Sequence, residues 1–250
     1  MNPAAILRTQ GLTKTFGGFV ANSNVSVDFP RGKLTAIIGP NGAGKSTFFN
    51  MISGGLAPSS GEILFEGKSV VGVKQHHFAR IGISKSFQIT NLFPDLTVLE
   101  NVRVAVQAIH CRFDLWSPRN RHREWVEKAE ELLRLVGLQQ RLRERADSLA
   151  HGEQRSLEIA VALASDPRLL LLDEPTAGMS PEETREIMDL ILKLLEHRTI
   201  GLVEHKMKLI MGVSDKIIVL HHGELLVQGT PDEIRSNDEV RRVYLGKAQH

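Results

Sequence analysis

The spacing of hydrophobic and polar positions changes twice along the chain. Residues 6–35 alternate apolar and polar positions around turn glycines, and residues 61–73 continue this pattern, which predicts short antiparallel strands. Residues 99–164 instead place their apolar positions at helical spacing. Residues 166–250 return to strands that alternate with helices. We therefore expect a β-rich N-terminal part, a helical middle and an α/β C-terminal part.

Three short apolar runs predict strands that are buried on both faces. They are rich in Leu, Ile and Val, are bounded by turn signals, and cover residues 34–38, 169–172 and 200–203. Capping boxes at residues 180–183 and 230–233, each with proline at the first helical position, predict two helix starts. Buried strands alternating with helices predict an α/β fold with a mainly parallel sheet covered on both faces.

Composition and charge narrow the class of protein. A chain of 250 residues is long enough for one domain that carries a subdomain. A net charge of +2 gives no strong basic field of the kind that binds nucleic acid. The single cysteine, Cys111, excludes an intramolecular disulfide and suits a reducing cytosol. No apolar stretch approaches the roughly 18 residues of a membrane span, and the N-terminus has no signal-peptide core, so we expect a protein that is not secreted and does not itself cross a membrane.

Residues 39–47 form a glycine-rich loop between an expected strand and an expected helix. They read GPNGAGKST and fit the pattern G-x-x-x-x-G-K-[ST]. Glycines let the backbone point successive N–H groups at a phosphate, and the helix N-terminus adds free N–H groups and its dipole. We expect Lys45 to reach the β- and γ-phosphates and the Ser46 hydroxyl to ligate Mg²⁺. The expected nucleotide-binding residues of this phosphate loop are Gly39, Pro40, Asn41, Gly42, Ala43, Gly44, Lys45, Ser46 and Thr47.

Two carboxylates follow the second buried run. Asp173 and Glu174 end the stretch LLLLDEP, where side chains emerge from a buried strand. We expect Asp173 to hold Mg²⁺ and Glu174 to orient or deprotonate the attacking water. A helix-capping turn is the alternative for Asp-Glu-Pro, and the phosphate loop upstream favours the metal and base roles.

Two further polar residues lie at expected strand ends. The amide of Gln88 can ligate Mg²⁺ and contact the water at once, so it can sense the γ-phosphate. The imidazole of His205 can donate a hydrogen bond to the γ-phosphate and hold the water against Glu174. Both residue types commonly lack such roles, so these two hypotheses depend on the phosphate loop.

Two other segments carry weaker signals. Residues 149–154, LAHGEQ, precede a helix, and a glycine at a helix start is a second candidate anion site. Residues 112–123 are rich in arginine; a solvated basic face is the first interpretation, and a contact with a partner or with lipid headgroups is the alternative.

Taken together, these elements resemble the ATP-binding cassette (ABC) family of P-loop NTPases. The phosphate loop, Gln88 at the Q-loop position, LAHGEQ as the signature, LLLLDEP as the Walker B motif and His205 as the switch histidine occur in the family's order and spacing. Phe16, upstream of the loop, matches the aromatic residue that stacks on adenine. The resemblance covers nearly the whole chain and implies a protein that binds ATP and Mg²⁺ and hydrolyses ATP.

The resemblance also implies a division of the chain. Residues 1–250 would form a single nucleotide-binding domain with a mainly parallel sheet core and an N-terminal antiparallel β subdomain. The RecA-like core would comprise residues 1–98 and 165–250, and a helical subdomain would span about residues 99–164.

The family implies a head-to-tail dimer. The signature of one copy caps the ATP on the phosphate loop of the other, so Ala150, His151, Gly152 and Glu153 would contact nucleotide in trans. Two positions depart from the family pattern: Ala150 stands where serine is commoner, and Ser180 stands where aspartate is common. Because of Ala150, we expect the dimer to close over ATP less strongly but still to close. Because of Ser180, we expect communication across the dimer to run through backbone contacts.

Within the family, three stretches resemble the branched-chain amino acid importer ATPases, most closely the larger of their two ATPases. These stretches are AHGEQRSLEIA, VEHKMKLIMGVSDKIIVL and GTPDEIRSNDEVRRVYLG. The resemblance implies an ATPase subunit at the cytoplasmic face of a bacterial inner membrane. Its partners would be a second ABC ATPase (identical or paralogous), two integral membrane permeases and, indirectly, a periplasmic solute-binding protein, with no nucleic acid.

Other functions stay open at this point. A urea or short-amide importer ATPase, or a lipopolysaccharide exporter ATPase, would differ in partners that the chain does not contain. A soluble cassette protein acting on ribosomes or DNA usually carries two cassettes or a long coiled-coil insertion, and this chain has neither. A non-hydrolysing regulator is disfavoured because Lys45, Glu174 and His205 are all present.

Overall fold

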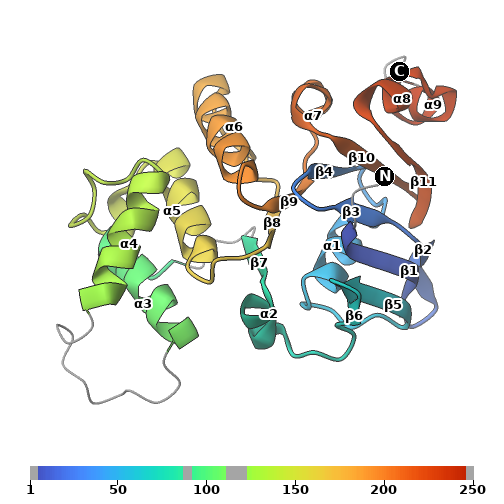
Figure 1. Ribbon diagram of the computed structural model, residues 1–250. Helices are drawn as coiled ribbons and strands as arrows, with labels where there is room; N and C mark the ends of the chain where they lie inside the picture. The colour runs from blue at the N-terminus through green and yellow to red at the C-terminus, as the bar shows by residue number, and fades with distance from the viewer. Residues whose placement is uncertain (1–4, 87–91, 111–122, 246–250) are drawn as a thin grey trace.

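The computed structural model describes residues 5–86, 92–110 and 123–245 of the chain. Two β-sheets lie beside each other, and a group of helices lies at the far end of the central sheet (Figure 1). The strands are β1 (Ala5–Phe16), β2 (Phe19–Val25), β3 (Asp28–Pro30), β4 (Leu34–Ile38), β5 (Ser60–Phe65), β6 (Lys68–Ser69), β7 (Ile83–Ser86), β8 (Leu169–Asp173), β9 (Thr199–Val203), β10 (Lys216–His221) and β11 (Glu224–Gly229). The α-helices are α1 (Lys45–Ile52), α2 (Gln75–Ile81), α3 (Val98–His110), α4 (Arg123–Leu135), α5 (His151–Leu163), α6 (Pro181–Leu195), α7 (Met207–Val213), α8 (Pro231–Ser236) and α9 (Asp238–Leu245).

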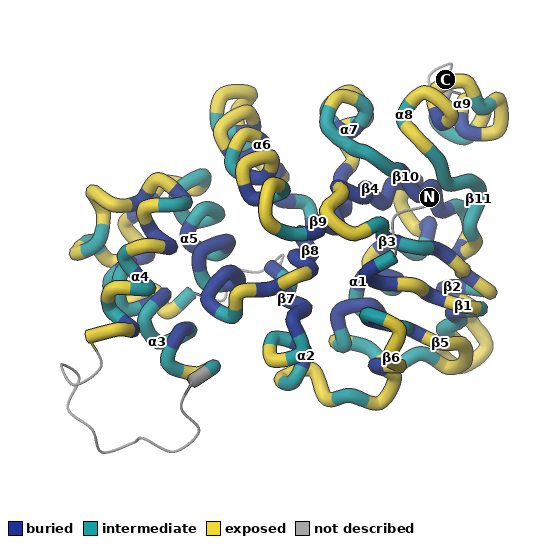
Figure 2. The backbone as a smooth tube through the Cα atoms, viewed as in Figure 1, coloured by how far each residue is buried: buried dark blue, intermediate teal, exposed yellow. Residues whose placement is uncertain are grey.

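The central sheet is parallel except at one edge. Its strand order is β11-β10-β4-β9-β8-β7, and β11 pairs antiparallel with β10. The leucines of β8 alternate between two cores: Leu170 and Leu172 pack with the helical side, whereas Leu169 and Leu171 pack with α1 and the N-terminal strands. Both faces are covered, so every position of the run is apolar and buried (Figure 2). This confirms the predicted α/β fold.

The N-terminal sheet is antiparallel, as its alternating sequence pattern predicts. Its order is β2-β1-β5-β6, and β3 also pairs with β1. In β1 the buried Leu7 and Thr9 alternate with the exposed Arg8 and Gln10. The Thr9 hydroxyl donates to the carbonyl of Val25 at 3.0 Å, which satisfies a polar group inside the core.

The helical group consists of α3, α4 and α5, which pack against one another. In α4, Trp125, Ala129 and Leu133 are buried at helical spacing. Residues 136–150 are not continuous helix: they form turns and a short 3₁₀ helix, Ala146–Ser148. Gly137 at φ +82° ends the helical run, because this left-handed conformation cannot continue a right-handed helix. The division of the chain near residues 98 and 165 stays a prediction.

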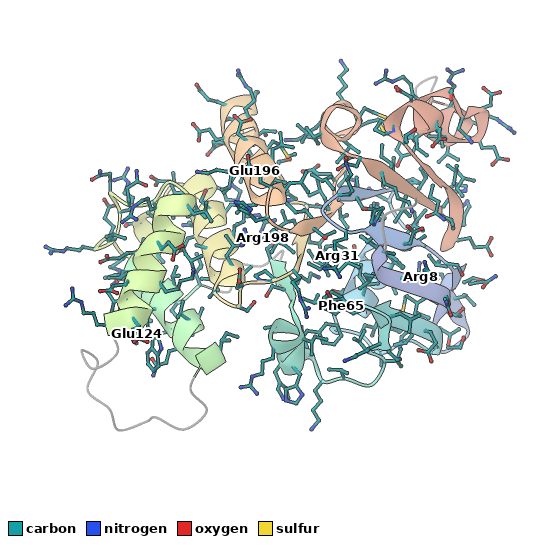
Figure 3. The ribbon with its side chains drawn as sticks, in the orientation of Figure 1. Arg8, Arg31, Phe65, Glu124, Glu196 and Arg198 are labelled. Carbon is teal, nitrogen blue, oxygen red and sulfur yellow. The ribbon has the colours of Figure 1, made fainter. Side chains whose placement is uncertain are left out.

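Ion pairs connect the N-terminal sheet with the end of the central sheet. The Glu66 carboxylate accepts from Arg31 at 2.6 Å and pairs with Arg168 at 2.5 Å. The guanidinium of Arg168 also lies 5.4 Å from the centre of the Phe65 ring. Figure 3 labels Arg31 and Phe65, and Phe65 is the last residue of β5. Long-range contacts of this kind fix how the β-rich part sits on the sheet that carries the site.

Both predicted capping boxes are present. Ser180 Oγ accepts from the Glu183 N–H at 3.2 Å, and the Glu183 carboxylate accepts from the Ser180 N–H at 2.9 Å. Thr230 and Glu233 make the same pair of bonds at the start of α8. Gln88, Cys111 and residues 112–122 of the arginine-rich stretch lie outside the described residues. None of the helices in the described ranges is long and apolar enough to cross a membrane.

Candidate functional site

The phosphate loop joins β4 to α1 and requires glycine at two positions. A Cβ atom on Gly39 would lie 2.3 Å from the carbonyl oxygen of Leu220. Gly44 has φ +89°, and a Cβ there would lie 2.6 Å from the carbonyl oxygen of Ala21. Neighbouring backbone therefore excludes any side chain at both positions. The two outer glycines of the sequence pattern are fixed by strands β10 and β2, which lie far from the loop in sequence.

Lys45 is held at the first position of α1. Its Nζ donates to the carbonyl oxygens of Gly39 at 2.8 Å and Pro40 at 2.9 Å. Burial lowers the pKa of Lys45, and the carboxylates of Glu174 and Asp173 oppose that shift. An ammonium group carries three donors, so this lysine can exchange loop carbonyls for phosphate oxygens without leaving the loop.

The parallel register brings two strand ends together beside the loop. Asp173 of β8 lies opposite Val203 of β9, and the Glu174 N–H donates to the Val203 carbonyl at 2.9 Å. His205 Nε2 then lies 2.6 Å from Glu174 Oε1. Glu174 adopts φ +47°, a left-handed conformation that is uncommon for a residue with a side chain and that concentrates at functional sites.

A cavity of about 410 Å³ unites these groups. Its lining consists of Phe19, Ala21, Asn41, Gly42, Ala43, Gly44, Lys45, Ser46, Thr47, Glu174 and His205. The N-terminus of α1 and the Lys45 ammonium attract anions, while Glu174 places a carboxylate at the edge of the same space. The arrangement can hold a polyphosphate and activate a water beside it.

Asp173 and Ser46 offer the oxygen donors that a magnesium ion prefers. Asp173 is buried, and within the described part of the chain its Oδ1 has no hydrogen-bond partner. The Ser46 hydroxyl belongs to a residue that lines the cavity. Hard oxygen donors of this type suit Mg²⁺. In residues 5–86, 92–110 and 123–245 no group of three or more His, Cys, Asp or Glu is arranged to hold a metal, so a zinc-type site is not indicated there.

The two aromatic residues of the first hairpin differ in position. Phe16 and Phe19 face each other across the β1–β2 turn, and both are exposed. Phe19 lines the cavity, and Phe16 is not part of that lining; the ammonium of Lys14 lies 5.2 Å from the centre of the Phe16 ring. The stacking role of Phe16 stays a prediction. Phe19 was missed by sequence reasoning, although its place beyond the turn Gly17-Gly18 was an available signal.

The signature lies at the start of α5. Ala150 is the N-cap residue, and its methyl group makes no side-chain capping bond. Its N–H donates to the Glu153 carboxylate at 3.0 Å. His151 is exposed, and Gly152 lies against Glu183 of α6.

The signature residues do not join the phosphate-loop cavity of their own chain. Ala150, Gly152 and Glu153 line a separate cavity of about 450 Å³ between α5 and α6. The two cavities share no lining residue. Within one chain the structure therefore brings Lys45 and Glu174 together, and it leaves the signature apart from them.

Two charged groups that sequence reasoning missed, the buried Glu204 and the largely buried Lys85, support the site. Glu204 accepts from the hydroxyl of Thr176 and, at 2.9 Å, from the N–H of His205. Lys85 of β7 lies 3.3 Å from Asp173. The signal for Glu204 was a carboxylate next to a candidate histidine at the end of an apolar strand. Lys85 gave no signal, because its contact depends on how β7 and β8 pair.

Comparison with known proteins identifies the family. Residues 22–177 match the family described as ABC transporter, which is more than half of the chain. The chain belongs to the ABC transporter ATPase family. Its C-terminal residues, 224–250, match the family described as branched-chain amino acid ATP-binding cassette transporter. This ABC protein is therefore an ATP-binding ATPase component of a transporter.

Relatives and solved structures match nearly the full length of this ABC ATPase. It is 41% identical to the high-affinity branched-chain amino acid transport ATP-binding protein LivG of Salmonella typhimurium, over 97% of the chain and 98% of LivG. The ADP conformation of MJ1267, an ATP-binding cassette of an ABC transporter, superposes with a TM-score of 0.86 at 30% identity, covering 97% and 99% of the two chains. A dimeric post-hydrolysis structure of the cassette MJ0796 bound to ADP and Pi matches with a TM-score of 0.77 at 28% identity, covering 90% and 98%.

Proposed function

We propose that this ABC ATPase powers the import of branched-chain or other hydrophobic amino acids. The observation that carries the catalytic part is the pairing of Glu174 with His205 at 2.6 Å on the wall of the phosphate-loop cavity. The substrate class is supported by the similarity to LivG and by the match of residues 224–250.

Each residue of the cavity has its own role in ATP hydrolysis. Lys45 and the N–H groups at the start of α1 bind the β- and γ-phosphates. Glu174 accepts a proton from the water whose oxygen attacks the γ-phosphorus, while the bond to the β–γ bridging oxygen breaks. In the tautomer protonated at Nε2, His205 donates to Glu174 and aims its carboxylate. Phe16 or Phe19 stacks on the adenine.

Ser46 and Asp173 are the residues that hold Mg²⁺ in this proposal, together with Gln88 from outside the described residues. Asp173 Oδ1, which has no hydrogen-bond partner among the described residues, supports this assignment. When bound, Mg²⁺ neutralises phosphate charge that would otherwise oppose attack. The chain's own contribution is to keep oxygen donors, and not nitrogen or sulfur, at this position.

We infer that the working unit contains two ATPase subunits. The signature residues Ala150, Gly152 and Glu153 line a cavity apart from the phosphate loop, which supports a role on the nucleotide of a second ATPase subunit. The dimeric structure of the related cassette MJ0796, bound to ADP and Pi, supports a working unit of two subunits. Two permeases, with a periplasmic binding protein on their outer side, complete the transporter, and the ATPase sits peripherally on the cytoplasmic face of the inner membrane. The surface around Phe93-Pro94 and Glu100-Asn101 meets the permeases.

Reconstitution tests this function. The chain is combined in proteoliposomes with the permease pair, second ATPase and binding protein encoded beside it, and uptake of labelled leucine is measured with internal ATP. We expect leucine and its branched-chain analogues to enter only with ATP. Uptake of urea or short amides instead would assign the chain to that importer class. Lipopolysaccharide movement, or no recovery of a membrane partner in a pulldown, would favour the exporter or the soluble cassette.

A further inference from the structure

Lys85 places a fixed positive charge beside the carboxylate assigned to the metal. Its Nζ lies 3.3 Å from Asp173 Oδ2, donates to Asn50 Oδ1 at 2.7 Å, and lies 5.0 Å from the centre of the Phe49 ring. The side chains of Lys85 and Asp173 are only 11% and 4% exposed. The pair is therefore enclosed, and water screens it weakly.

Three elements of the site converge on this ammonium group. Lys85 belongs to β7, where it lies opposite Leu171 of β8, and Asp173 ends β8. Asn50 and Phe49 belong to α1, the helix that the phosphate loop opens. The contacts with Asn50 and Phe49 do not involve Asp173, so they hold the ammonium in place whatever Asp173 binds.

The two oxygens of Asp173 have different surroundings. Oδ2 faces the Lys85 ammonium, whereas Oδ1 has no hydrogen-bond partner among the residues that the structure describes. A buried carboxylate without a counter-charge is strongly unfavourable. Lys85 supplies a counter-charge in direct contact with Oδ2, in addition to the charge of the Lys45 ammonium, while Oδ1 is left available to a second cation or to its water.

We propose that Lys85 is a resident stand-in cation for Mg²⁺. It compensates Asp173 in the metal-free protein, and because it cannot leave, it weakens the binding of Mg²⁺ to the nucleotide complex by repulsion. Lys85 is thus a positioning residue that holds the Asp173 carboxylate in place through Oδ2, and that keeps the metal exchangeable between turnovers. This inference rests on the proposed Mg²⁺–nucleotide function of the same site.

The test compares Lys85→Met, Lys85→Arg and, as a matched loss of charge elsewhere, Lys68→Met on the exposed strand β6. Magnesium affinity is measured by titrating buffered Mg²⁺ into each full-length protein saturated with a fluorescent ADP analogue. We expect Lys85→Met to bind Mg²⁺ more tightly, on the order of tenfold, because a neighbouring positive charge is gone. Lys85→Arg and Lys68→Met should keep the wild-type affinity.

Stability without metal provides the second readout. In EDTA, Lys85→Met should lower the melting temperature, and the same change in an Asp173→Asn background should lower it much less, because no buried carboxylate then needs a counter-charge. Equal losses in the two backgrounds would refute the stand-in role. Weaker or unchanged Mg²⁺ affinity in Lys85→Met would refute the repulsion. If Lys85→Met does not fold, Lys85→Gln carries both measurements.

Nucleotide binding in EDTA separates this inference from the proposed function. If the wild-type protein binds the ADP analogue, but the wild type and the Lys85 variants then bind Mg²⁺ with equal affinity, the inference alone is overturned. Wild-type protein that fails to bind the analogue under any condition would overturn the proposed function, and the Lys85 inference with it.

Discussion

His205 Nε2 lies 2.6 Å from Glu174 Oε1, across the ends of two adjacent parallel strands. Both residues line the same cavity as the phosphate loop. The Glu174 side chain is half as exposed as that of His205, at 20% against 43%. The histidine is therefore open to solvent, while the carboxylate that it contacts is partly withdrawn. This geometry suits a base that is oriented by its neighbour.

Replacing Glu174 with glutamine should reduce turnover to a small residual rate and leave ATP binding intact. The amide keeps the size of the side chain and can still bond to His205, but it cannot accept a proton from water. We expect the hydrolysis rate to fall by about 10²–10⁴-fold, the usual contribution of a general base. ATP-bound dimers should accumulate, which size-exclusion chromatography with the proposed partner subunit would detect.

The control for this variant is Glu182→Gln, which removes an exposed carboxylate on α6. It should hydrolyse ATP at the wild-type rate. Wild-type turnover in the Glu174 variant would remove Glu174 as the base and return Asp-Glu-Pro to a capping role.

Replacing His205 with alanine should lower kcat with little change in KM for ATP. The variant loses the contact that aims Glu174, whereas Lys45 and the loop backbone still bind the phosphates. A loss of about 10²-fold or more is expected for an orienting group at the reaction centre. The exposed His197→Ala provides the comparison. If KM rises and kcat holds, His205 binds nucleotide uniformly and does not act on the base.

The affinity for ATP should decrease at alkaline pH because of Lys45. Burial lowers the pKa of this lysine in the nucleotide-free protein, so the ammonium is lost below the ordinary value of 10.5. Phosphates bind the protonated form, and binding above the free-state pKa must take up a proton. The dissociation constant should therefore rise with pH from the free-state pKa up to the higher pKa of the complex.

Equilibrium binding of a fluorescent ATP analogue across neutral to alkaline pH measures this dependence. Lys45→Ala should bind far more weakly at neutral pH and should lack the alkaline decrease. A wild-type affinity that does not change with pH, or a Lys45→Ala variant with unchanged affinity, would contradict the assignment of the loop.

Local features of the fold were predictable from the sequence. Ser180 and Glu183 lie within one helical turn, so the local sequence alone predicts the capping box. The buried run at residues 169–172 is apolar at every position because helices and strands cover both faces of the sheet. The glycines of the phosphate loop belong to the same class of local signal.

Long-range contacts were not predictable. The ion pair of Lys85 with Asp173 depends on β7 lying beside β8, and nothing in the letters around residue 85 specifies that neighbour. Phe16 and Phe19 are equally aromatic and equally close to the turn, and only the placement of the hairpin over the loop distinguishes them. The turns and short 3₁₀ helix of residues 136–150, between α4 and α5, likewise depend on how the packed helices are placed.

Glu204 should be the most costly of the supporting residues to remove. It is 3% exposed, and it accepts from the hydroxyl and the N–H of Thr176 and from the N–H groups of His205 and Lys206. Glu204→Ala leaves the hydroxyl and the N–H of Thr176 buried without this acceptor. Because buried polar groups left unsatisfied cost about 1–3 kcal/mol each, we expect at least that loss in the free energy of unfolding, measured with urea.

Two further variants separate the loss of the hydrogen bonds to Glu204 from a simple loss of packing. Glu204→Gln retains one acceptor oxygen and should lose less stability than Glu204→Ala. Glu62→Ala removes an exposed carboxylate whose partner is the Ser69 hydroxyl, and it should change stability by less than about 0.5 kcal/mol. Because Glu204 joins the backbone of His205 to Thr176, the alanine variant should also lose hydrolysis at temperatures where it is still folded. Full activity in that folded variant would show that His205 is positioned without Glu204.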